Sequence, residues 1–306
     1  TFAKSLAANG QSFKIRINAI VNGGSQFNAS SAFPLTNAYP EDAFEFEYIV
    51  PNNTTSIQVQ IMLGNFTGIY FLDDFETTIE DDNTAWSGAT NTDWATSTNW
   101  NNGVPTNSLN ASIPSGLSNY PAISVATGAA VKNLDVDAGA ALTIASGGSL
   151  IVSGTSSGNV TYNRNLATTD WYLVSSPVEG QDIDAFVLAE GLASGTGSNL
   201  GLGDYDNSTP DWTYYLNGAS GTGNFTSGDG RAIKLASTGD ISFTGTINTS
   251  DVTLAMTSNS NGFNLVGNPY TSYVAGNENA DGTNNILTIN SANLTENTLW
   301  FWNQST

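Results

Sequence analysis

The sequence predicts an all-β protein, and three observations support this class. Several segments alternate apolar and polar residues with a period of two, as half-buried strands do. Charged residues make up only 11% of the 306 residues, so the side chains that favour long helices are scarce. Gly, Ser, Thr and Asn are abundant instead, and these residues suit the turns between short strands.

The first predicted domain, residues 1–80, is a partial jelly-roll β-sandwich. Segment 12–21 (SFKIRINAIV) alternates large apolar residues with Lys14, Arg16 and Asn18. The same period recurs in AFEFEYIVP, SIQVQIMLG and GIYFLDDFE, with polar loops between them. Half-buried antiparallel strands of a sandwich account for this pattern.

The second predicted domain, residues 81–165, follows the acidic linker TTIEDDNTA. Trp86, Trp94 and Trp100 lie in its polar, Gly-rich first part. Flat exposed rings there would bind the apolar face of a sugar, which makes these three candidate carbohydrate-binding residues; the alternative is that they plug the end of a small β-domain. The stretch AVKNLDVDAGAALTIASGGSLIVSG then places apolar residues at alternating positions between Gly turns. It predicts short stacked strands, in a β-roll or a small β-helix.

The third predicted domain, residues 166–306, is a second β-sandwich-like unit. Trp300 and Trp302 would share one face of its last strand and are expected in the core. A single helical turn is predicted in QDIDAFVLAEG, with Asp182 or Asp184 as its N-cap. The other candidate elements are strands: DWYLVSSP, DWTYYLNG, GRAIKLAS, DISFTGTIN, DVTLAMTS, GFNLVGNP and NTLWFWNQ.

Two phrases of the third domain, WYLVSSP and FNLVGNP, repeat one pattern of an aromatic residue, any residue, Leu-Val, two small or polar residues and Pro. The apolar residues would fill a core strand, and Pro would end it. Ser175 and Ser176 have no His and no nucleophile-elbow context. The repeat is therefore expected to be scaffold.

Three segments resemble parts of large secreted surface proteins of Bacteroidota that are exported by the type IX secretion system. AFEFEYIVPNNTTSIQVQIMLGN and GIYFLDDFE are similar to the closing strands of a carbohydrate-binding jelly roll. That resemblance implies a structural calcium at Asp73 or Asp74. WSGATNTDWATSTNWNNGVP is similar to a linker-like motif, and WYLVSSPVEG and GFNLVGNPY resemble the β-domain that precedes a C-terminal sorting domain. The resemblance implies a piece of a longer protein, at an extracellular or outer cell-surface location.

Two loops have the spacing of calcium ligands. The loop NENADG carries oxygen ligands at the first, third and fifth positions of an EF-type loop, although Thr288 stands where a bidentate Glu is expected. The loop DYDNSTPD supplies three further carboxylates. Capping of turns is the alternative role for such residues. The candidate ligands in these loops are Asn277, Asn279, Asp281, Asp204, Asp206 and Asp211.

Composition excludes several functions. A net charge of −20 repels nucleic-acid phosphate and anionic lipid, and no apolar run reaches transmembrane length. The chain has no His and no Cys, so thiol nucleophiles, Ser-His catalysis and the usual zinc sites are absent. Only carboxylate-pair chemistry would remain, and no pair is singled out. The chain is therefore expected not to be an enzyme.

Three functions remain in view. The first is a non-catalytic extracellular cell-surface module, adhesive or glycan-binding, whose partner is a polysaccharide or another surface glycan. The alternative is a structural subunit that binds copies of itself and forms a filament or sheath by strand or edge complementation. The third is a fragment of a secreted polysaccharide-degrading enzyme.

Overall fold

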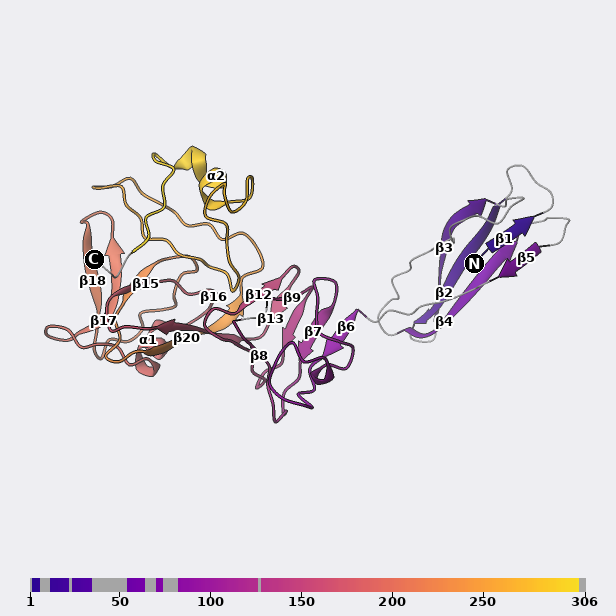
Figure 1. The fold of residues 1–306 in the computed structure, drawn as a ribbon, viewed down its shortest axis with the longest axis horizontal. Coiled ribbons are helices and arrows are strands. Elements are labelled where there is room, and N and C mark those ends of the chain that lie inside the picture. Colours follow the sequence, from indigo (N-terminus) through magenta and orange to yellow (C-terminus); the bar gives the residue numbers. More distant parts are fainter. Residues whose placement is uncertain are drawn as a thin grey trace. The chain divides into compact units, whose positions relative to one another are not determined.

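The computed structural model consists mostly of strands in several sheets (Figure 1). The α-helices in the described part of the chain are two short ones, which confirms the predicted all-β class. None of the helices that the structure describes is long and apolar enough to cross a membrane. The residues that the structure describes are 2–5, 12–21, 24–34, 54–63, 70–73, 82–125 and 128–302.

The chain divides into two compact units, residues 1–80 and residues 81–306. The boundary falls in the acidic run that the sequence marks as a linker. Segments 81–165 and 166–306, which the sequence suggests as separate domains, both lie in the second unit and contribute to one hydrophobic core.

The first unit contains two antiparallel sheets, one of order β3-β2-β4 and one that pairs β1 with β5. The strands expected at 12–21, 56–64 and 68–76 are present, whereas the strand expected at 43–51 lies outside the described residues. The bounds are β1 Phe2–Ser5, β2 Ser12–Val21, β3 Gly24–Pro34, β4 Thr54–Leu63 and β5 Tyr70–Asp73.

The alternation in β2 fails at Asn18. The period of two places this residue on the polar face, yet its side chain is only 4% exposed, and the neighbouring Ala19 is fully buried. Both sides of β2 are therefore covered at this point. The Asn18 amide donates to Gln58 Oε1 at 3.2 Å, which offsets part of the cost of burying it.

The second unit begins with strands that stack in parallel, and we call residues 82–166 the coil stack. One sheet has the order β13-β10-β7-β6, a second contains β14-β11-β8, and a third pairs β12 with β9. Residues 111, 134 and 156 pair across successive strands, so one coil takes about 22 residues. This is the stacked arrangement that the Gly-punctuated sequence predicts.

The strands of the coil stack are short. Their bounds are β6 Asn83–Ala85, β7 Asn110–Ile113, β8 Ala122–Ile123, β9 Gly128–Val131, β10 Leu134–Val136, β11 Thr143–Ile144, β12 Ser149–Val152, β13 Ser156–Ser157 and β14 Val160–Leu166. The 3₁₀ turn η1 (Ser97–Asn99) lies in the loop between β6 and β7.

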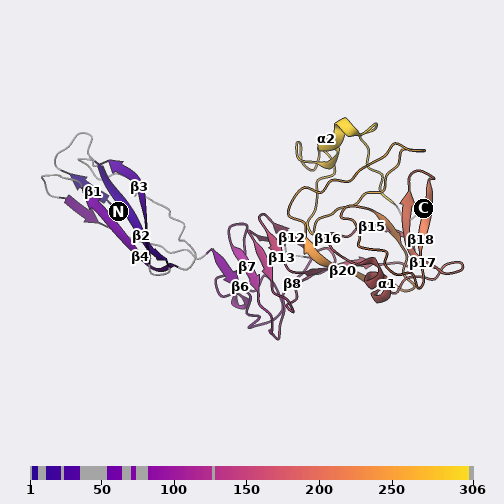
Figure 2. The ribbon, with the colours of Figure 1, turned by 180° about the vertical axis from the view of Figure 1, so that it is seen from behind.

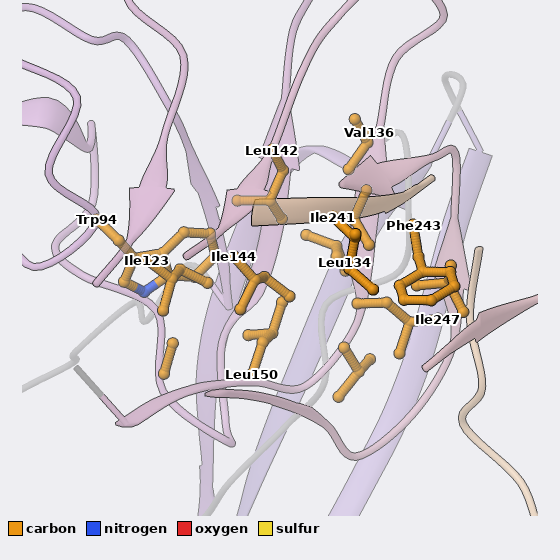
Figure 3. Packing of buried hydrophobic residues seen from close by; sticks show 14 of the residues in the cluster. Trp94, Ile123, Leu134, Val136, Leu142, Ile144, Leu150, Ile241, Phe243 and Ile247 are labelled. Carbon is orange, nitrogen blue, oxygen red and sulfur yellow. The ribbon is translucent and has the colours of Figure 1, made fainter. Parts of the chain in front are cut away.

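The hydrophobic core continues from the coil stack into antiparallel structure. β14 pairs antiparallel with β20 (Gly239–Ile247), which pairs with β16 (Val178–Glu179). Figure 3 shows Ile123 and Ile144 of the coil stack in one line of packed side chains with Ile241 and Phe243 of β20. All four are at most 1% exposed.

The second unit also contains a four-stranded antiparallel sheet in the order β15-β19-β17-β18; Figure 2 labels three of its strands, β15, β17 and β18. Its side toward the core carries Leu202 and Ile233, which are 4% and 0% exposed. The bounds are β15 Tyr172–Val174, β17 Asn199–Asp206, β18 Asp211–Leu216 and β19 Arg231–Ile233.

The predicted helical turn is confirmed as α1 (Ile183–Ala189). Asp182 is its N-cap, since its Oδ1 accepts a hydrogen bond from the Ala185 N–H at 2.8 Å. Asp184, the other candidate, accepts a hydrogen bond from the Tyr215 hydroxyl at 2.6 Å instead.

The strands expected at 251–258 and 262–269 are not found, and these segments run irregularly apart from a bridge between Val266 and Asp229. The strand expected at 297–304 is not found in its described part, residues 297–302, and its last two residues lie outside the described residues. In part, amide side chains replace the strand partners. Asn264 accepts from the Thr257 N–H at 3.1 Å and donates to the Thr257 carbonyl at 2.9 Å. The short elements α2 (Ile286–Asn290) and η2 (Ser291–Asn293) lie between the last two segments.

Candidate functional site

The three tryptophans proposed to bind sugar lie inside the protein. Trp86, Trp94 and Trp100 are 1%, 1% and 5% exposed. Trp100 meets both other rings edge-on, with ring centroids 5.1 Å from Trp86 and 4.7 Å from Trp94. Trp100 Nε1 donates to the Trp94 carbonyl at 2.8 Å. No ring face is left open to a sugar, so these residues act as the plug that was the alternative role.

The loop that carries these tryptophans, residues 86–103, closes the first rung of the coil stack, and we call it the cap loop. Asn101 Oδ1 accepts from the Ala85 N–H at 2.7 Å, and the Asn102 amide donates to the Asn83 carbonyl at 3.1 Å. The open edge of β6 is thereby hydrogen-bonded within the chain. Such an edge is a poor template for another strand.

A ladder of amides runs along the outside of the coil stack. Asn110 Nδ2 donates to Asn83 Oδ1 at 3.0 Å, and Asn133 Nδ2 donates to Asn110 Oδ1 at 2.7 Å. The Thr155 N–H ends the ladder on Asn133 Oδ1 at 2.7 Å. The ladder borders a shallow polar groove of about 250 Å³. Because its amides bond one another, the ladder reinforces the stack.

Sequence analysis did not identify this ladder. Its signal is the recurrence of Asn at the head of the short strands, in NTA, NASI and NLDV. The pattern becomes informative only when the parallel register is known.

The candidate calcium ligands of the loop DYDNSTPD take part in turns and an ion pair. Asp204 Oδ2 lies 2.8 Å from Arg231 Nη1. Asp206 Oδ1 accepts from the Ser208 hydroxyl at 2.6 Å, and this bond is the largest cause that lowers the pKa of Asp206. Asp211 Oδ1 accepts from the N–H of the next residue at 2.8 Å.

The candidate calcium ligands of the loop NENADG also take part in turns. Asn277 Oδ1 accepts from the Asn279 N–H at 3.1 Å, and Asp281 Oδ1 accepts from the Asn284 N–H at 2.8 Å. This backbone hydrogen bond is the largest cause that lowers the pKa of Asp281. Among the described residues, no three His, Cys, Asp or Glu side chains lie close enough together to hold a metal ion.

The first calcium candidates belong to the first unit. Asp73 is the last residue of β5 and pairs with Phe2 of β1. Asp74 lies outside the described residues. Calcium at this pair remains a prediction.

Four aromatic side chains gather on the outer side of the sheet β15-β19-β17-β18. The ring centroids of Tyr205 and Trp212 are 5.2 Å apart, and those of Trp171 and Tyr214 are 5.6 Å apart. Trp212 and Tyr214 stand two positions apart on β18 and so share one face. All four are half-buried, and we call this surface the aromatic face.

Small residues lie beneath these rings. A Cβ on Gly203 would come within 3.2 Å of Tyr214 Cε1 and 3.3 Å of Trp212 Cε3, so both rings rest on the backbone of β17. Ala232 is the register partner of Gly203 on β19. Rings that rest on small residues can present their opposite faces to a ligand.

Trp302 lies next to this surface. Its indole N–H donates to the Trp171 carbonyl at 3.0 Å, and its side chain is 61% exposed. Trp300 is 74% exposed, so the expectation that these two residues lie in the core is wrong. They occupy an irregular segment rather than a strand, and hence no strand face directs them inward.

A family model described as "Domain of unknown function (DUF8693)" matches residues 85–306. The match begins at the last residue of β6 and covers the cap loop, the rest of the coil stack and the aromatic face. No curated protein and no solved structure matches the chain.

Proposed function

The chain belongs to the DUF8693 family, and we propose that it is a non-catalytic extracellular surface module that binds glycans through the aromatic face. The observation that carries the proposal is the set of four half-buried rings on one side of one sheet, above Gly203 and Ala232. Rings held in this way pack against the apolar face of a sugar.

The arrangement of the rings supports a ligand rather than core packing. The other side of the same sheet is the buried one, through Leu202 and Ile233. Tyr172 and Tyr215 pack against the core, whereas Trp171 and Tyr214 contact each other. The aromatic face thus combines apolar area with access to solvent, as ligand sites do.

The polar groups beside the rings also suit a glycan. Asn261 Nδ2 donates to the Tyr205 hydroxyl at 2.8 Å, and Asn207 Oδ1 accepts from the Thr257 hydroxyl at 2.9 Å. Neutral amides and hydroxyls next to aromatic rings orient sugar hydroxyls without requiring a charge.

The absence of catalysis is part of the proposal. The chain has no His and no Cys. Two carboxylates beside the Tyr205–Trp212 pair take part in turns, since Asp206 accepts from the Ser208 hydroxyl and Asp211 accepts from the Trp212 N–H. Export by a type IX system, as in the Bacteroidota proteins that the sequence resembles, would account for a location outside the cell.

Affinity electrophoresis of the full chain through gels that contain soluble polysaccharides tests the proposal. We expect the wild type to be retarded in at least one gel, and Trp212→Ala to weaken binding about tenfold. Tyr273→Ala is the matched control, because Tyr273 is 79% exposed and belongs to a different segment. Equal retardation of all three proteins would contradict the role of the aromatic face.

Self-assembly is a second candidate function, and the exposed segment 300–302 favours it. Trp300, Phe301 and Trp302 are 74%, 86% and 61% exposed, and adjacent exposed aromatic residues mark interaction sites. In contrast, the closed edge of β6 disfavours assembly through that end of the coil stack. Sedimentation velocity at increasing protein concentration distinguishes self-assembly from a monomeric protein. A single monomeric species throughout would argue against assembly, and larger species lost in Trp300→Ala would support it.

A further inference from the structure

We infer that the ligand of the aromatic face is an extended neutral polysaccharide and that anionic glycans are excluded from it. This inference rests on the proposed function and specifies its ligand class. It is carried by the line of the rings and by the carboxylates at its two ends.

The rings form a strip rather than a single platform. Trp171 contacts Tyr214, and Trp212 contacts Tyr205, at centroid distances of 5.6 Å and 5.2 Å. Tyr214 and Trp212 are separated by two residues of one strand, about 6.6 Å. Rings placed one after another can each contact a successive sugar residue, which favours a polymer over a monosaccharide.

Carboxylates flank the strip. Asp170 directly precedes Trp171 and is exposed. At the other end, Asp206 and Asp211 are register partners next to the Tyr205–Trp212 pair, and both are exposed.

The carboxylate of Asp206 is stabilised in its charged form. Hydrogen bonds from Ser208, and above all the bond from its hydroxyl, lower the pKa of Asp206. Like charges within a Debye length of about 8 Å at physiological ionic strength repel an acidic sugar.

Cations nearby do not compensate. Arg231 is engaged by Asp204 and Asp229, at 2.8 Å and 2.9 Å. Among the described residues of this sheet and those directly beside it, Lys234, directly after β19, carries the other positive charge, against the three carboxylates that flank the strip. The net charge of −20 acts in the same direction over a longer range.

Binding to two panels of polysaccharide of matched chain length tests the inference. One panel is neutral, such as a β-glucan, a xylan and a glucomannan, and the other is anionic, such as alginate and polygalacturonate. We expect wild-type protein to bind a neutral member at least about tenfold more tightly than any anionic one. High salt should narrow this ratio, since about 1 M salt shortens the Debye length to ~3 Å.

Charge-neutral variants sharpen the test. Asp206→Asn and Asp170→Asn should each reduce the preference for neutral over anionic polysaccharide several-fold. Neither substitution should change the affinity for neutral polysaccharide. Asp251→Asn, an exposed carboxylate elsewhere, makes the same change of charge and serves as the control. Asp170→Asn keeps the test valid if Asp206→Asn disturbs the turn.

The outcomes separate the inference from the function on which it rests. Binding to neither panel would contradict the proposed function itself. Binding to the anionic panel that is equal or tighter, and that is still lost in Trp212→Ala, would show that the ligand need not be neutral. The aromatic face would remain the binding site.

Discussion

The Ser175 hydroxyl donates a hydrogen bond to the Asn268 carbonyl at 3.0 Å. This contact joins the two phrases WYLVSSP and FNLVGNP, which share one sequence pattern. Gly267 lies against the same serine, since a Cβ on it would meet Ser175 Oγ. The phrases are therefore contacting pieces of scaffold, although only the first includes a strand, β15.

Gly267→Ala should destabilise the protein. The added Cβ would lie 2.5 Å from Ser175 Cβ, so backbone must shift to accommodate it. We expect a loss of about 1–3 kcal/mol in the free energy of unfolding, measured by urea denaturation. Gly282→Ala is the control, because nothing lies within 4 Å of its Cβ position. Equal midpoints for the two variants would show that the contact is not tight.

Trp94→Ala tests whether the cap loop stabilises the second unit. Trp94 is 1% exposed, and its removal leaves a cavity beside Trp100 and Ile123. We expect a loss of about 3–5 kcal/mol in the free energy of unfolding. Trp300→Ala removes the same ring from an exposed site and should change stability by less than about 0.5 kcal/mol. A Trp94→Ala protein as stable as Trp300→Ala would rule out the plug.

Asp182→Ala removes the N-cap of α1. Its carboxylate accepts from the Ala185 N–H at 2.8 Å, so that donor would lose its partner. The expected cost is about 1 kcal/mol, measured by thermal denaturation. Asp170→Ala makes the same chemical change at an exposed position outside any helix and should have little effect. Similar melting curves would mean that the cap contributes nothing.

The lowered pKa of Asp184 predicts that the protein loses stability in acid. Hydrogen bonds from the hydroxyls of Thr222 and Tyr215, in that order, lower its pKa in the folded state. A lowered pKa stabilises the fold above the unfolded pKa of about 4, and this contribution is lost as pH falls through the folded pKa. In Asp184→Asn the melting temperature should therefore fall less steeply below pH 4 than in the wild type. Parallel pH profiles for the two proteins would contradict this role.

Calcium at Asp73 and Asp74 is testable through the first unit. A bound ion would stabilise the fold by about 2.7 kcal/mol at a hundred times its dissociation constant. We expect a chelator to lower the melting temperature of the wild type and to leave that of the double variant Asp73→Asn, Asp74→Asn unchanged. An unaltered wild-type melting curve would remove the calcium site.

Local pattern predicted several segments in which apolar and polar residues alternate along the strand. β2, β4 and β20 were recognised in this way, and α1 was recognised from its acidic N-cap. Segment 262–269 was also predicted as a strand but forms none, and Asn264 bonds the backbone of Thr257 in the place of a strand partner. A side-chain amide that substitutes for a strand leaves no trace in hydrophobic periodicity.

Local sequence pattern was also insufficient to predict the candidate site. Trp86, Trp94 and Trp100 stand among polar residues, and only the parallel stacking of β6 and β7 shows that they are enclosed. Trp171 and Trp212 are more than 40 residues apart, and the repeated pair Asp-Trp was their only common signal. Their position on one side of one sheet follows from the pairing of β15 with β19 and of β17 with β18.

The coil stack can be extended without remaking its ends. The cap loop closes β6, and β20 continues the sheet beyond β14, so neither closure depends on the number of coils between them. One more coil of about 22 residues between β10 and β13 would lengthen the stack by one strand spacing, about 4.8 Å. Duplication or deletion of a single coil would therefore change the length of the stack in fixed steps and leave the sheet β15-β19-β17-β18 unchanged.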